Sequence, residues 1–154
     1  MTDRRTIREV VLQALYAAEI SRDKLDHILN TIINEKINKK SSSDNFGEKL
    51  FLKTARLKDE FDDIIQEHIR NWKLDRLAMI DKLILRMAIC EFLYFDEIPT
   101  KVTINEAIEI AKKFSTKKSD KFVNGILDAA LESLDKEGRI KKTGRGLIDT
   151  TINS

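Results

Sequence analysis

Apolar residues recur every three or four positions along most of this chain, the spacing that draws one apolar face along an α-helix. The first such stripe predicts a helix over about residues 3–20, and a second pattern covers residues 25–33. A third runs from about residue 47 to 70, and these three helices can form one small bundle. Between the second and the third, NKKSSSDNFG has the polar residues and the glycine of a surface loop.

Residues 76–95, RLAMIDKLILRMAICEFLYF, are apolar on nearly every side. A helix of this kind, whole or broken in two, lies at the centre of a bundle in a water-soluble protein. Asp75 can cap it. Because Lys82 and Arg86 stand four residues apart on one face, we expect both side chains to reach solvent or an acidic partner together.

Two further helices are predicted after Pro99. Thr103 and Glu106 have the spacing of a capping box, which begins a helix that continues to about Phe114. Ser119 can cap the last helix. The core-facing stripe of that helix consists of Val123, Ile126, Leu127, Ala130, Leu131 and Leu134.

Composition favours an all-α protein. The chain has 154 residues but only five glycines and one proline, too few for the turns of a sheet protein. This length suits one compact domain, which we expect over residues 1–136. The remaining segment, 137–154, is basic, contains three glycines and lacks periodicity, so we expect a mobile tail.

Cys90 is the single cysteine of the chain, which excludes an intrachain disulfide and suits a reducing compartment. It lies inside an apolar run, so we expect its thiol to be buried. The first residues, MTDRRTIREV, lack the apolar stretch of a secretory signal. No segment approaches the ~18 uninterrupted apolar residues of a membrane span. We therefore expect a soluble, cytoplasmic protein.

Catalytic chemistry finds little support in the sequence. His27 and His68 are far apart, neither belongs to a metal-ligand spacing, and no glycine-rich phosphate loop is present. The carboxylates within residues 59–63 are better explained as a solvated helix face. We expect no enzymatic activity, no metal and no cofactor.

A binding surface is the better hypothesis. The formal net charge is only +2, so any nucleic-acid site must come from local clustering of charge. Phe122 begins the last helix at the border of its core stripe, where it can cover the core edge or stack on a base. Cations on phosphates and aromatic rings on unpaired bases are how proteins hold single-stranded RNA. The lysines that surround this position are Lys112, Lys113, Lys117, Lys118 and Lys121.

The first helix carries a second stripe, offset from its core stripe, that contains Arg5, Arg8, Leu12 and Tyr16. Together with Arg4, these arginines can contact RNA or can form a merely solvated face. Tyr16 can bind a partner or simply complete the core.

Four segments carry a family resemblance, and they follow one another along residues 4–131: RRTIREVVLQALY, WKLDRLAMIDKLILRMAICEF, IPTKVTINEAIEIAKKFS and SDKFVNGILD. In order and spacing they resemble the NusB transcription antitermination family. The resemblance implies an all-α fold of about seven helices, arranged as two small three-helix-type bundles, without enzymatic activity. It also implies binding of the boxA element of ribosomal RNA transcripts together with NusE, a small-subunit ribosomal protein. The pair then joins RNA polymerase with other Nus factors.

The resemblance also assigns individual residues. Those expected to contact RNA are Arg4, Arg5, Arg8, Arg86, Lys121, Phe122 and Asn124. Lys117 and Lys118 join this set from a loop in which family members often carry an acidic residue, so this chain can grip RNA more tightly or less selectively. The candidates for docking NusE are Tyr16, Asp75 and Asp81.

Alternatives remain. The chain can be a protein-interaction adaptor without RNA binding of its own. It can also be a stand-alone relative of the helical domains fused to ribosomal-RNA cytosine methyltransferases, although we expect no catalytic domain beyond residue 154. A second copy of the chain, in a homodimer, is a further candidate partner for the RNA surface.

Overall fold

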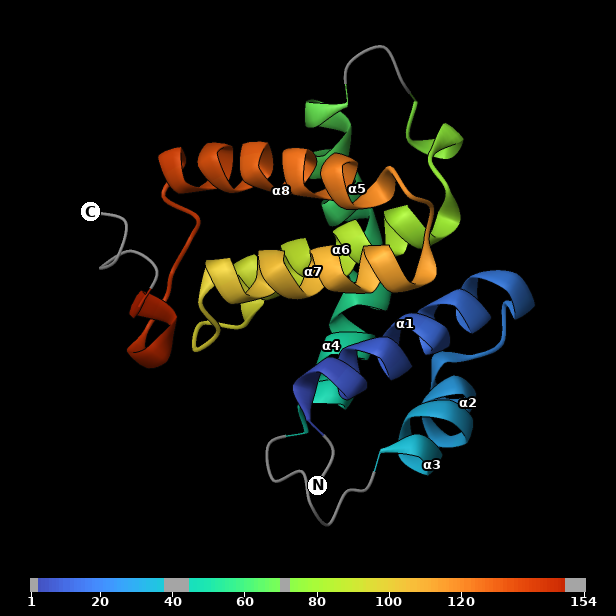
Figure 1. Cartoon of the computed structure of the whole chain (residues 1–154). Coiled ribbons are helices and arrows are strands. Elements are labelled where there is room, and N and C mark those ends of the chain that lie inside the picture. Colours follow the sequence, from blue (N-terminus) through green and yellow to red (C-terminus); the bar gives the residue numbers. More distant parts are fainter. Residues whose placement is uncertain (1–2, 38–44, 70–72, 149–154) are drawn as a thin grey trace. The chain divides into compact units, whose positions relative to one another are not determined.

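The computed structural model describes residues 3–37, 45–69 and 73–148, and all regular structure in these ranges is helical (Figure 1). The chain divides into two compact units, residues 1–58 and residues 59–154, and each is described by itself. The predicted all-α class with two small bundles is confirmed. The sequence predicts a domain over residues 1–136 followed by a tail, whereas the structure divides the chain between residues 58 and 59.

The first unit is built around its first helix, which packs against residues 25–33 of the second predicted helix and against the helix over residues 46–56. Asp3 caps this helix, because its Oδ1 accepts a hydrogen bond from the Thr6 N–H at 2.8 Å. The second predicted helix is also present and contains a wide π-helical turn in its middle. The elements are α1 (Arg4–Ser21), α2 (Leu25–Ile28), η1 (Leu29–Ile33), α3 (Asn34–Lys36) and α4 (Phe46–Arg56).

The second unit contains three helices that pack against one another in pairs, α6, α7 and α8, with α7 and α8 side by side in Figure 1. A further helix, α5, is joined to α6 by hydrogen bonds between their side chains. The elements are α5 (Lys58–His68), η2 (Leu74–Arg76), α6 (Met79–Tyr94), α7 (Thr100–Phe114), α8 (Ser119–Lys136) and η3 (Gly144–Leu147).

The helix predicted over residues 47–70 is interrupted at Leu57. Its first half, α4, belongs to the first unit, and all but the first residue of α5 belongs to the second. The expected grouping of all three N-terminal helices in one bundle is therefore wrong. Leu57 leaves the helical conformation, with φ −105° and ψ 21°, although neither a glycine nor a proline marks the site.

The central helix α6 is a single unbroken helix, and residues 83–92 are buried without exception, Cys90 among them. The buried charged residues of α6 have polar partners on neighbouring elements. Arg86 donates two hydrogen bonds to Asp62 of α5, from Nε to Oδ1 at 2.7 Å and from Nη2 to Oδ2 at 2.8 Å. Glu91 Oε1 accepts a hydrogen bond from the Thr103 hydroxyl at 2.9 Å.

Two predictions about the first residues of α6 and α7 are wrong, and the prediction for Arg86 is confirmed in part. Arg86 reaches an acidic partner, Asp62, which was one of its two predicted alternatives, but it is buried there and does not reach solvent beside the half-buried Lys82. Thr103 does not cap α7, which begins three residues earlier, at Thr100. Asp75 does not cap α6 either, since it lies within η2 and α6 begins without a side-chain cap.

Residues 137–148 return to the second unit instead of leaving it. Gly138, with φ +71°, lets α8 end in a Schellman motif, in which the Arg139 N–H donates to the Leu134 carbonyl at 2.9 Å. The buried Lys142 ammonium then donates to the carbonyls of Glu91 and Phe95, at 2.9 and 2.8 Å, at the C-terminal end of α6. A cation is favourable there because the helix dipole is negative at that end. The expectation of a mobile tail is thus corrected as far as residue 148, and residues 149–154 lie outside the described part.

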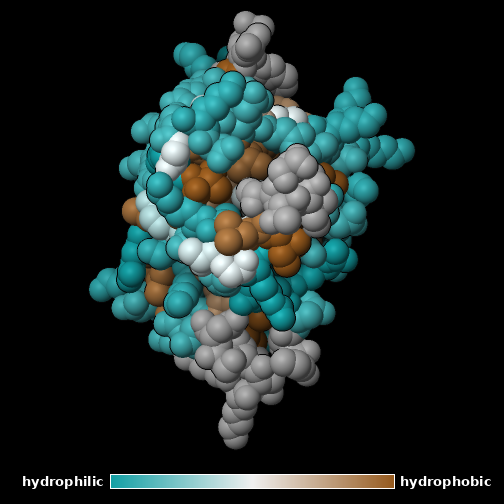
Figure 2. Space-filling model, turned by 90° about the vertical axis from the view of Figure 1, so that its left-hand side faces the viewer, coloured by the Kyte–Doolittle hydropathy of each residue, from teal (hydrophilic) through white to brown (hydrophobic). Residues whose placement is uncertain are grey.

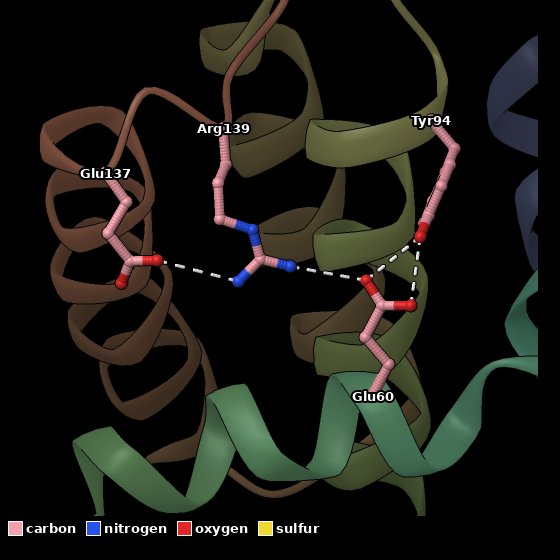
Figure 3. Close-up of polar contacts among 4 residues, drawn as sticks. All are labelled: Glu60, Tyr94, Glu137 and Arg139. Carbon is pink, nitrogen blue, oxygen red and sulfur yellow. Dashed lines mark hydrogen bonds and ion pairs between the residues drawn. The ribbon is translucent and has the colours of Figure 1, made fainter.

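One polar cluster joins this returning segment to α5 and α6 (Figure 3). Glu60 accepts the Tyr94 hydroxyl with both carboxylate oxygens at 2.9 Å and pairs with Arg139 Nη2 at 3.3 Å. Arg139 Nη1 also lies 3.6 Å from Glu137 Oε2. Burial raises the pKa of Tyr94 above its ordinary value of 10.0, and the hydrogen bond to Glu60 and its negative charge raise that pKa further.

Replacing Glu60 by Gln is expected to lower the pKa of Tyr94 toward its ordinary value, because an amide does not repel the phenolate. In the native protein, Tyr94 has a raised pKa, so its contribution to the free energy of unfolding is fully present below pH 10.0. This contribution is lost as the pH rises through the folded-state pKa. Titration of tyrosinate absorbance measures the shift. The chain has two tyrosines, so Tyr94→Phe identifies the transition, and an unchanged midpoint in Glu60→Gln would contradict the role of Glu60.

Candidate nucleic-acid interface

The turn between α7 and α8 is anchored on α6 by a buried carboxylate. Asp81 Oδ1 accepts a hydrogen bond from the Ser115 hydroxyl at 2.7 Å, and Asp81 Oδ2 accepts one from the Ser119 hydroxyl at 3.0 Å. Ser119 Oγ also lies 2.9 Å from Ser115 Oγ and 3.0 Å from Thr116 Oγ1. Ser119 therefore begins α8 as predicted, but its hydroxyl binds Asp81 instead of capping the helix.

A cleft of about 330 Å³ lies beside this anchored turn. Its wall combines cations, apolar surface and an aromatic ring, contributed by Arg76, Leu77, Ala78, Lys118 and Phe122. The Phe122 side chain is half-buried, which agrees with the predicted position at the border of the core. A pocket with apolar walls and a few polar groups suits a flat ligand with polar edges.

Positive charge is concentrated on the same turn. Lys117, Lys118 and Lys121 are exposed, and the N-terminal end of α8 adds the positive end of its helix dipole. The other two lysines of the predicted cluster have local roles in the last turn of α7. Lys112 pairs with Glu109 at 3.5 Å, and the Lys113 ammonium lies 5.4 Å from the centre of the Phe114 ring.

In the first unit, two of the predicted arginines converge on one ring. The guanidinium carbons of Arg4 and Arg8 lie 4.5 and 5.1 Å from the centre of the Phe46 ring. Arg8 is only 4% exposed, so a merely solvated arginine face is wrong for this residue, whereas Arg5 is exposed. Phe46 was expected in a surface loop but is buried as the first residue of α4.

The candidates for protein docking differ in exposure. Tyr16 is 42% exposed on α1, and Asp75 is exposed on η2. Asp81 is only 8% exposed and both its oxygens accept hydrogen bonds within the second unit. Its assignment to a docking surface is therefore corrected to a structural role.

Arg86 likewise has a structural role in place of the predicted contact with RNA. Its side chain is 7% exposed and its guanidinium is occupied by Asp62, so a direct contact with RNA would have to break a largely buried ion pair. Asn124 is half-buried in the second turn of α8.

The predicted residues thus form two groups, one in each unit. Lys118 and Phe122 line one cleft, next to Lys117 and Lys121, while Arg4 and Arg8 share the Phe46 ring. Whether the two groups face one RNA stays a prediction. Phe46, Arg76 and the hydroxyl groups within residues 115–119 that anchor the turn were not predicted from the sequence. The run STKKS is the local signal that could have indicated these hydroxyl groups.

In residues 3–37, 45–69 and 73–148, no three histidine, cysteine or acidic side chains lie close enough to hold a metal ion. No helix within those ranges has both the length and the apolar character needed to cross a membrane.

Replacing Asp81 by Ala should lower the free energy of unfolding by about 1–3 kcal/mol, because the hydroxyls of Ser115 and Ser119 lose a buried acceptor. Asp75→Ala is the matched control, since an exposed carboxylate without such contacts changes stability by less than about 0.5 kcal/mol. Urea unfolding followed by helix content measures both. Equal stabilities for the two variants would contradict the anchoring role of Asp81.

The sequence and the fold of this chain are similar to those of known proteins. Residues 5–132 match the model of the NusB family. The transcription antitermination protein NusB of Salinibacter ruber is 45% identical over 148 residues, which are 96% of this chain and 92% of that protein. A NusB structure from T. maritima has a TM-score of 0.77 and 39% identity, and the match covers 85% of this chain and 92% of that one.

A second solved structure, a crystal structure of the antitermination factors NusB and NusE in complex with double-stranded RNA, contains a chain of the same fold. Its TM-score is 0.74 at 24% identity, over 84% of this chain and 96% of that one. At this identity the likeness shows the fold alone. From the family match and the close sequence relative, the chain belongs to the NusB family of transcription antitermination proteins, a family without enzymatic activity.

Proposed function

We propose that this chain acts in transcription antitermination by binding unpaired RNA of the boxA type, together with NusE, on its α7–α8 turn. The observation that carries the proposal is the anchored turn itself, which presents three exposed lysines and the Phe122 ring beside one cleft. A chain of the same fold occurs in a solved complex of NusB and NusE with double-stranded RNA, so NusE and RNA are the first partners to test.

The turn combines the two kinds of contact that single-stranded RNA requires. Exposed ammonium groups neutralise phosphates without reading sequence, which gives salt-sensitive affinity. An aromatic face adjoining a cleft of about 330 Å³ can stack on a base, which adds about 1–3 kcal/mol per base. Asp81 lies on the buried helix α6 and anchors the turn that carries both the lysines and Phe122. The turn therefore loses little conformational freedom when RNA binds.

Unpaired RNA fits this arrangement better than a duplex. The bases of a duplex are stacked on one another, so a single ring beside a cleft cannot reach the face of a base. The fold relative contains double-stranded RNA, and binding assays should therefore compare both forms directly.

The arginines of α1 form the second set of proposed RNA contacts. Arg5 is exposed and Arg4 is half-buried on the Phe46 ring, so both can reach a phosphate. Arg8, which is buried, supports them from within the unit.

In the first unit, NusE is proposed to contact the C-terminal half of α1; in the second unit, η2 is a separate proposed contact. Tyr16 and Ile20 lie four residues apart on α1 and are 42% and 64% exposed, so they form an apolar strip that a protein partner would cover. Asp75 offers a carboxylate to a basic ribosomal protein. Assembly with RNA polymerase and other Nus factors, in the cytoplasm, follows from this role.

Replacing Phe122 by Ala should weaken binding of boxA RNA by about 1–3 kcal/mol, because the stacking face is lost. Phe122→Leu is the matched control, since leucine keeps most of the apolar volume at the core edge but has no ring. Both variants should bind RNA weakly while retaining the native helix content. Affinity is measured by gel shift with single-stranded and double-stranded RNA, with and without NusE.

Three outcomes decide the matter. Native affinity in Phe122→Leu would return the ring to a core-edge role. Capture of NusE without any binding of RNA would favour the adaptor. Competition between RNA binding and self-association would instead identify a second copy of the chain as the occupant of this surface.

A further inference from the structure

Phe46 is a buried residue with no assigned role, and it lies where two guanidinium groups meet. Its side chain is 2% exposed, and Arg4 and Arg8 lie 4.5 and 5.1 Å from its ring centre. The two arginines stand four residues apart on α1, a spacing at which like charges repel. The negative face of an aromatic ring offsets this repulsion.

Gly47 allows the ring to come this close to α1. A Cβ atom at this position would lie 2.7 Å from Ile37 Cδ1 and 2.9 Å from Ile7 Cγ2, both closer than packed atoms approach. The N-terminal turn of α4 therefore lies directly against α1, and Phe46 lies beside the arginines because of that close approach.

A guanidinium that packs on a ring keeps its hydrogen-bonding capacity. The group is planar, so it stacks through its face while its N–H donors point outward along its edge. Arg4 can thus contact the Phe46 ring and a phosphate at the same time. Arg8 is 4% exposed, which makes it the inner of the two cations and Arg4 the outer.

We infer that Phe46 is a positioning residue for RNA binding: its ring, which the buried Arg8 also contacts, holds the Arg4 guanidinium in the orientation that meets a phosphate. This inference rests on the proposed function. An arginine ordered before binding loses less side-chain freedom when RNA arrives, so the benefit appears as affinity.

A double-mutant cycle tests the inference. Phe46→Leu should weaken binding of boxA RNA about fivefold to tenfold, the range of a lost cation–π contact. Phe51→Leu is the matched control, because Phe51 is equally buried in α4 and has no cation over its ring among the described residues. It should change RNA affinity by less than about twofold. In an Arg4→Ala background, Phe46→Leu should add less than about twofold, because the group through which it acts is gone.

A measurement on the native chain covers the case in which Phe46→Leu does not fold. Before RNA is added, NMR relaxation of the Arg4 Nε–H group should show an ordered side chain. The comparison is Arg22, which is exposed at the C-terminal end of α1. Equal mobility of the two side chains would overturn the inference.

The failures are distinguishable. If Arg4→Ala binds RNA as tightly as the native chain, the proposed RNA contact on α1 fails, and the role of Phe46 fails with it. If Arg4→Ala weakens binding but Phe46→Leu behaves like Phe51→Leu, only the inference about Phe46 is wrong. A Phe46→Leu effect of full size in the Arg4→Ala background would likewise show that Phe46 acts through packing alone.

Discussion

Burial of α6 is the constraint on which the second unit depends. The helix is covered on nearly every side, yet it carries three buried charged residues, Asp81, Arg86 and Glu91. A buried charge without partners is strongly unfavourable, so each of these groups requires polar groups from a neighbouring element. The partners come from different places: the α7–α8 turn for Asp81, α5 for Arg86 and α7 for Glu91. The charges of one helix thus help to determine where its neighbours attach.

The candidate site is a consequence of this arrangement. The same carboxylate whose burial must be compensated also fixes the turn that presents Lys118 and Phe122. In the first unit, a close approach of α4 to α1 has a similar effect, because it brings Phe46 against Arg4. In both units, the residues that hold the surface differ from those that would touch RNA. Asp81 and Phe46 position the two surfaces, whereas the lysines of the α7–α8 turn, Phe122 and Arg4 are the proposed RNA contacts.

Local patterns predicted the fold well where one helix buries one clear stripe. α1 and α8 were predicted within a few residues because their apolar positions keep helical spacing over about five turns. The break at Leu57 was missed because no residue there marks a helix end, and the capping box at Thr103 was wrong because a distant carboxylate, Glu91, takes the hydroxyl. The basic turn and Phe122 were visible in the sequence since they are neighbours in it. The roles of Asp81, Arg86 and Phe46 were not, because each depends on a contact far along the chain.

The central claim is that the anchored α7–α8 turn is the surface that meets unpaired RNA. An NMR titration of the isotope-labelled chain with single-stranded boxA RNA tests it most directly, because backbone amide shifts report contacts residue by residue. The account predicts the largest shifts at residues 116–124, with little change around Tyr94 and Arg139. Large shifts around Tyr94 and Arg139, with residues 116–124 unmoved, would contradict it.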